Sequence, residues 1–152
     1  DVIGHHSILT DQEVPRLNVE NVTIDLLEAT RLLRQSDTAL RQGALPAAHH
    51  FLISALDKFG TRIIFPELYD TFFEALRDDI ENERRDLILR VSQALLNEAD
   101  PRNAEEILQR GFHAMPDDEE IAALLCNTLI QNGKRVQAQR VQIKLREAIA
   151  SN

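Results

Sequence analysis

Residues 104–116 read AEEILQRGFHAMP, and the spacing of small and large side chains in this segment indicates how the chain folds. Ala104 and Gly111 allow a neighbouring helix to approach closely, Leu108 fills the groove between them, and Pro116 ends the helix. The same spacing returns later in the chain, at Ala138, Gln142, Leu145 and Ala150. A repeat of about 34 residues is typical of stacked helical hairpins. The second copy replaces the Leu and the Pro, as expected where such an array ends.

A third copy of the small, large, small pattern lies earlier in the chain, at Ala48, Leu52 and Ala55. We therefore predict three helical hairpins, over about residues 24–59, 80–115 and 118–150. The interval from Ala48 to Ala104 is longer than that from Ala104 to Ala138, and we assign the excess to a connector and to the leading part of a long helix. These unequal intervals distinguish the chain from a regular array of adaptor repeats.

Capping and helix-breaking residues place the individual helices. Apolar periodicity runs over about 24–42 up to Gly43, and it resumes from Pro46 to Gly60. No Gly or Pro interrupts the segment after Pro66 as far as Ala99, which predicts one long helix or two helices with a kink near residues 78–79. Further helices are predicted over about 101–115, 118–131 and 134–150, with Asp100 capping the first and Asp117 or Asp118 the second.

About seven helices with almost no strand pattern predict an all-α protein. The only extended segments expected are a lead-in or linker over residues 1–21, followed by a single domain over 22–152, and a short apolar connector over residues 61–65. Because the chain begins at Asp1 and not at Met, we expect it to be part of a longer protein.

Composition narrows the class of protein. The chain has one Cys and no apolar run near the roughly 20 residues of a membrane span, and its start lacks the pattern of a signal peptide, so we expect a cytoplasmic protein without a membrane partner. Residues 67–120 carry 16 acidic and 6 basic side chains, whereas residues 121–152 carry 1 and 5. The net charge of −8 argues against direct binding of nucleic acid, although an acidic middle and a basic end permit head-to-tail self-association.

The order and spacing of four blocks resemble a known family. They are GALPAAHHFLISAL at Gly43–Leu56, LRDDIENERRDLILRVSQALL at Leu76–Leu96, the segment Ala104–Leu125, and the closing segment Gly133–Leu145. Over about residues 17–150 the chain is similar to the bacterial transcriptional activator domain, a tetratricopeptide-like module of regulators of the antibiotic-regulatory-protein type. Members of that family usually carry an aromatic residue, often Trp, near the end of the second helix. This chain has Phe59 there and contains no Trp.

The resemblance implies a stack of hairpins in a right-handed superhelix, and a regulatory domain that mediates dimerisation or transmits a signal. In the family this module normally follows a winged-helix DNA-binding domain. Residues 1–21 are too short to fold as one, so DNA is expected to be contacted only by a domain outside this sequence. The alternative is a free-standing tetratricopeptide-type adaptor that binds a peptide or a partner helix. Residues upstream of Asp1 would discriminate the two.

Residue patterns of enzymes and cofactor sites are absent from the sequence, so we predict a non-enzymatic protein without cofactor or metal. His49 and His50 are adjacent and point about 100° apart on a helix, which does not suit chelation of one metal ion. Cys126 occupies a small-residue position of the repeat and is expected to pack against the neighbouring helix. The segment RDDIENERRD is expected to form a solvated face with pairs such as Glu81 and Arg85.

A stack of hairpins presents the first helix of each pair on its concave surface, where such arrays bind a peptide or a partner helix. The candidate partner-binding residues on those helices are polar: Arg31, Gln35, Thr38, Arg84, Arg85, Ser92, Asn127 and Gln131.

Overall fold

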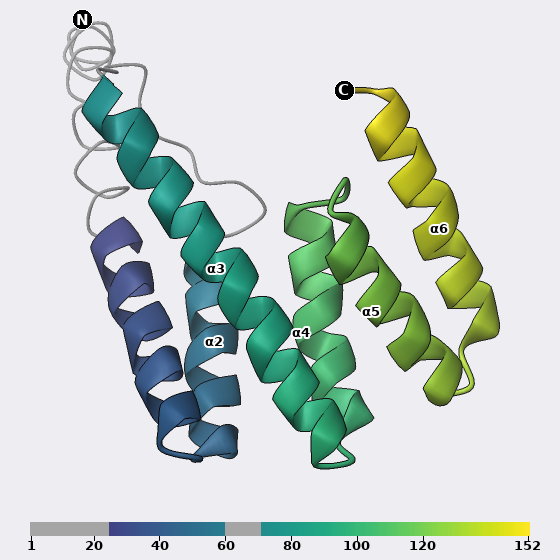
Figure 1. Cartoon of the computed structure of the whole chain (residues 1–152), viewed down its shortest axis with the longest axis horizontal. Helices are drawn as coiled ribbons and strands as arrows, with labels where there is room; N and C mark the ends of the chain where they lie inside the picture. Colours follow the sequence, from purple (N-terminus) through teal and green to yellow (C-terminus); the bar gives the residue numbers. More distant parts are fainter. Residues whose placement is uncertain (1–24, 60–70) are drawn as a thin grey trace, which may run out of the picture.

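The computed structural model describes residues 25–59 and 71–152, which form six helices and no strand (Figure 1). Residues 25–41 form the first helix, followed by α2 (Leu45–Phe59), α3 (Thr71–Asn97), α4 (Pro101–Ala114), α5 (Glu119–Gln131) and α6 (Arg135–Ala150). The helices lie side by side in chain order, from the purple first helix to the yellow α6 (Figure 1). The prediction of an all-α protein is confirmed for these residues. The predicted lead-in over 1–21 and the connector over 61–65 lie outside them.

The helix boundaries follow the capping residues that the sequence offers. Asp100 caps α4 by accepting a hydrogen bond from the amide of Asn103 at 3.3 Å. Asp118, and not Asp117, caps α5, because its carboxylate accepts from the amides of Glu120 and Ile121. Both caps place an anion at the positive end of the helix dipole.

The long helix differs from one of its two predicted forms. The kink predicted as an alternative near residues 78–79, which would make seven helices, is absent, because α3 is one uninterrupted helix of 27 residues. Asp78 and Asp79 are both exposed on it. Their carboxylates therefore point into water and do not compete for the backbone hydrogen bonds of the helix. The predicted start of this helix at Pro66 lies outside the described residues.

Each of the three hairpins turns at the same hydrogen-bonded motif. The turn residue has a positive φ, at Gly43 (73°), Ala99 (59°) and Gly133 (76°). Its amide donates to the carbonyl three residues earlier at 3.0–3.1 Å, and the next amide donates to the carbonyl five residues earlier at 2.8 Å. This pair of bonds is the Schellman motif, which satisfies the last carbonyls of a helix. The turns recur at the same two intervals as the small residues of the sequence pattern.

The same intervals recur in the packing of side chains within each hairpin. Ser36 Oγ donates to the carbonyl of Ala48 at 2.8 Å, and Cys126 Sγ donates to the carbonyl of Ala138 at 3.5 Å, in both cases across twelve residues. Ala48, Ala104 and Ala138 are all buried. A methyl side chain at this position lets the second helix of the hairpin approach the first.

Gly111 lies at the closest approach between α4 and its neighbours. A Cβ atom added there would lie 3.0 Å from Ile88 Cγ2 of α3 and 3.6 Å from Ile121 Cγ2 of α5. Leu108, one turn earlier, is fully buried. Ala104, Leu108 and Gly111 are therefore packing residues of the core, whereas Pro116 is exposed.

Two repeat positions that are apolar and buried in α4 carry polar side chains in α6. Leu108 and Phe112 of α4 are buried, whereas Gln142 and Arg146, which occupy the equivalent repeat positions in α6, are exposed. Only Ala138 and Val141 of α6 are buried. Polar side chains suit these positions, because no other described helix covers this side of α6.

Candidate functional site

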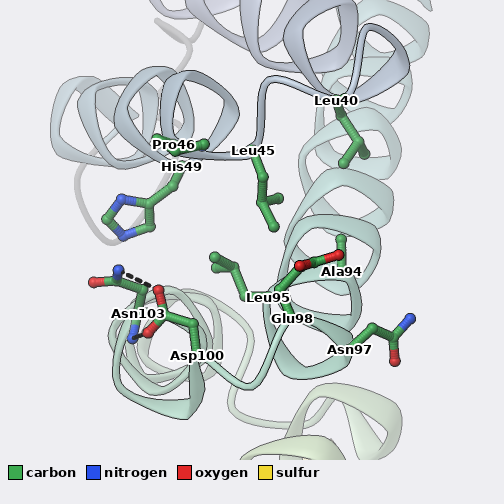
Figure 2. Close-up of a pocket in the computed structure, with 11 residues that line it drawn as sticks. Leu40, Leu45, Pro46, His49, Ala94, Leu95, Asn97, Glu98, Asp100 and Asn103 are labelled. Carbon is green, nitrogen blue, oxygen red and sulfur yellow. Dashed lines mark hydrogen bonds between the residues drawn. The ribbon is translucent and has the colours of Figure 1, made fainter.

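A hollow of about 660 Å³ opens between the turn that precedes α2 and the turn between α3 and α4 (Figure 2). Leu45 of α2 and Leu95 of α3 point toward one another across it, whereas His49 points toward Asn103 of α4 (Figure 2). Its full lining consists of Leu40, Gly43, Leu45, Pro46, His49, Ala94, Leu95, Asn97, Glu98, Asp100 and Asn103. The hollow therefore joins the first two hairpins at their turns.

Two polar side chains of this hollow, Asp100 and Asn103, pair with each other. The Asp100 carboxylate caps α4 and also accepts from Asn103 Nδ2 at 2.7 Å. His49 Nε2 is buried, lies 3.5 Å from the Glu106 carboxylate, and has no hydrogen-bond partner with good geometry among the described residues. The described lining contains no hydroxyl, thiol or amine that an imidazole could activate as a nucleophile.

A second groove, of about 450 Å³, lies between α4 and α6, and we refer to it as the α4–α6 groove. Its apolar lining comes from all three of the last helices, whereas its polar lining contains cations and amides but no carboxylate among the described residues. The lining residues are Gln109, Phe112, His113, Pro116, Leu125, Leu129, Gln137, Arg140, Val141 and Lys144.

The predicted partner-binding residues do not form one surface. Arg31, Thr38, Asn127 and Gln131 are exposed and Gln35 is half-buried, each on the first helix of a hairpin as predicted. Two predicted members, Arg84 and Ser92, lie instead in the core and are not available to a partner.

Ser92 is buried because it belongs to the interior of the repeat. It is equivalent to Ser36 in the preceding hairpin and to Cys126 in the following one, at the position that faces the second helix of each hairpin. Its hydroxyl is buried and has no hydrogen-bond partner among the described residues. Comparison of the three copies would have identified this position as a core position.

Arg84 is 2% exposed and lies on the buried side of α3, one turn after Ile80. Its guanidinium carbon lies 5.5 Å from the centre of the Phe59 ring, a cation–π arrangement. Burial lowers the pKa of Arg84, and the charge of Glu81 only partly opposes this. Its Nε and Nη1 atoms have no hydrogen-bond partner within the part of the chain that the structure describes.

Arg85 is half-buried and joins α3 to the start of α5. It forms an ion pair with Asp118, the N-cap of α5, and a second with Glu120 at 2.8 Å. The hydrogen bonds that Arg85 donates to Asp118 and Glu120 raise the pKa of its guanidinium. The predicted pair of Arg85 with Glu81 is therefore wrong: the guanidinium is held by carboxylates from another hairpin.

A buried ionic cluster at Glu105 was missed by sequence reasoning. Glu105 is 6% exposed, and its carboxylate accepts hydrogen bonds from Lys134 Nζ at 2.7 Å and Asn132 Nδ2 at 2.6 Å. The two donors flank Gly133, so the cluster ties the α5–α6 turn to α4. The only signal in the sequence is a charged residue directly after the small residue Ala104, on the side that the repeat buries.

Cys126 packs as predicted. It is 7% exposed, and burial raises the pKa of its thiol. In the described part of the chain, no three His, Cys, Asp or Glu side chains gather where they could hold a metal ion. Nor does any described helix have the length and apolar character to cross a bilayer. Comparisons with models of protein families, with curated proteins and with solved structures each found no match.

Proposed function

We propose that the chain is a non-enzymatic interaction domain of a bacterial transcriptional regulator, and that it mediates dimerisation or transmits a signal to a DNA-binding domain outside residues 1–152. It acts in the cytoplasm and contacts other proteins, not DNA or a membrane. The observation that carries the proposal is the exposure of large apolar side chains on the last helix. Val136 is 62% and Ile143 55% exposed, and a spacing of seven residues puts them on one face of α6.

The proposed fold is a tetratricopeptide-like stack that coils as a right-handed superhelix. The support for it is the repetition of one turn motif and one buried alanine in each hairpin, at matching intervals along the chain. In such a stack each hairpin contacts mainly its neighbours, so long continuous surfaces remain available for partners.

A second candidate function is a free-standing adaptor that binds a peptide or a partner helix. The α4–α6 groove favours it, because the groove combines apolar side chains with the cations Arg140 and Lys144. Grooves of this composition accept amphipathic helices.

Sedimentation equilibrium of the 152-residue chain tests the proposal. We expect self-association that weakens by about tenfold in the V136E/I143E variant, because two carboxylates would have to be desolvated in the interface. The R135Q/Q142E variant is the matched control, since it changes the net charge by the same amount at exposed polar positions on another side of the same helix. A wild-type chain that sediments as a monomer at every concentration would contradict the dimerisation role.

A further inference from the structure

The α4–α6 groove differs from the corresponding surface of the preceding hairpins in its charges. Between α2 and α4, Arg110 forms an ion pair with Asp57, and Glu106 lies 3.4 Å from the same guanidinium. Two carboxylates therefore neutralise the cation that lies between these two helices.

Alignment of the hairpins on their buried alanines identifies the equivalent positions one unit later. In this alignment Asp57 corresponds to His113, whereas Glu106 and Arg110 correspond to Arg140 and Lys144. Both carboxylates are thus replaced by nitrogen-bearing side chains, and the cation is retained. All three replacements line the α4–α6 groove.

The cations of this groove are uncompensated within the described structure. Neither Arg140 nor Lys144 forms an ion pair with any described carboxylate, and both are exposed. Glu147 is the only acidic residue in residues 121–152. The groove therefore has apolar side chains beside two cations that form no ion pair with a described carboxylate.

We propose that the α4–α6 groove binds an acidic amphipathic helix of a partner protein. Arg140 and Lys144 are four residues apart, so they project from one side of α6 about one helical turn from each other. Carboxylates one turn apart on the bound helix pair with them. The apolar side of that helix lies against Pro116, which is exposed, and against the edges of Phe112 and Val141, which are 7% and 8% exposed.

A second copy of this chain is a poorer occupant than a separate partner. Its most acidic helical stretch is the first half of α3, but Ile80 there is 5% exposed and Leu76 is half-buried, so neither apolar side chain is free to enter the groove. The acidic start of α5 is already engaged, because Asp118 and Glu120 pair with Arg85.

This inference rests on the proposed interaction function and names the partner class of one surface. The test uses two fluorescently labelled peptides with leucines at helical spacing on one face, one with glutamates on the other face and one with lysines there. Fluorescence anisotropy measures their binding to the full chain, to R140E/K144E, and to the matched control R135E/R146E. The control reverses two exposed charges of the same helix outside the groove.

We expect the glutamate peptide to bind the wild type and the control with similar affinity, and to bind R140E/K144E about tenfold or more weakly. The lysine peptide should show the opposite preference, and added salt should weaken the first interaction. If R140E/K144E and the control R135E/R146E lost affinity for the glutamate peptide equally, the binding would depend only on net charge, and the assignment to this groove would be wrong. Equal affinity for both peptides, or no binding of the glutamate peptide, would also overturn it.

Sedimentation of the same samples separates this inference from the proposed function. If the chain self-associates but does not bind the glutamate peptide, the groove assignment fails while the interaction role stands. If R140E/K144E abolishes self-association, the occupant is a second copy and the proposed partner class is wrong. If the chain is monomeric but binds the glutamate peptide at this groove, the groove assignment stands and the dimerisation role fails.

Discussion

The Lys134 ammonium lies 2.7 Å from the carboxylate of Glu105, a side chain of α4 that is almost completely buried. Asn132 donates to the second oxygen of the same carboxylate. One acidic side chain thus fixes the turn that begins the last helix. This relationship makes the attachment of α5 and α6 to the rest of the stack sensitive to acid.

We expect the stability of the protein to fall with acid in a way that depends on Glu105. Burial raises the pKa of Glu105, but the hydrogen bonds from Lys134 and Asn132 outweigh burial, so the folded pKa lies below its ordinary value. The contribution of ionised Glu105 to the free energy of unfolding is therefore fully present above the unfolded pKa of about 4.3, and it is lost as pH falls through the folded pKa. Urea denaturation between neutral pH and about pH 3 should show this loss in the wild type.

The E105Q variant should lose about 1–2 kcal/mol at neutral pH and show a flatter dependence on pH. The E98Q variant is the control, because Glu98 is exposed, and it should change stability by less than about 0.5 kcal/mol. If the free energy of unfolding depended on pH in the same way for the wild type and E105Q, Glu105 would not control the sensitivity to acid.

The G111A variant should be less stable than the wild type by about 1 kcal/mol. An added Cβ would lie 3.0 and 3.2 Å from two carbons of Ile88, which is fully buried and cannot easily move, and this cost exceeds the gain of about 1 kcal/mol in helix propensity. G111V should lose about 3 kcal/mol. Urea denaturation of these variants measures the change, with R102A, at an exposed position of the same helix, as the control. A higher midpoint of urea denaturation for G111A than for the wild type would contradict the close packing.

The A99G variant should be more stable than the wild type by about 1 kcal/mol. Ala99 has φ 59° in the α3–α4 turn, whereas the other two turns place Gly at this position. Only Gly adopts that backbone conformation without a steric cost. A94G, inside α3, should have the opposite sign by about the same amount. Thermal denaturation of both variants measures the change in midpoint temperature. A lower midpoint for A99G than for the wild type would contradict the strain inferred at Ala99.

The Cys126 thiol should react slowly in the folded protein. Burial raises its pKa, so the reactive thiolate is scarce, and the side chain is 7% exposed. A disulfide reagent should modify the folded chain about a hundredfold more slowly than the chain in denaturant. Fast modification without denaturant would mean that α6 opens readily from α5.

The R84M variant should be at least as stable as the wild type, with an expected gain of about 1 kcal/mol. The guanidinium is buried against Phe59, and two of its nitrogens have no described hydrogen-bond partner, so an unbranched apolar side chain fits the same place without the cost of a buried charge. R84A should lose about 2 kcal/mol or more through the cavity that it leaves. Urea denaturation of both variants tests this, and a loss of stability in R84M equal to that in R84A would refute it.

The ends of the helices and the repetition of the hairpins can be predicted from local residue patterns. Capping by Asp100 and Asp118 and the turns at Gly43 and Gly133 depend on a few neighbouring residues, so these signals can be interpreted without knowledge of the rest of the chain. The repeat of buried alanines shows in the sequence because each hairpin packs with the same internal geometry.

Which polar residues face solvent and which charges form pairs depends on how the helices pack together. Arg84 and Ser92 were expected on a binding surface and lie in the core, because the exposed side of a helix is set by the helices that cover it. Arg85 was expected to pair with Glu81 and pairs with Asp118, 33 residues away, because an ion pair requires closeness in space and not in sequence. The α4–α6 groove likewise depends on how α4, α5 and α6 come together.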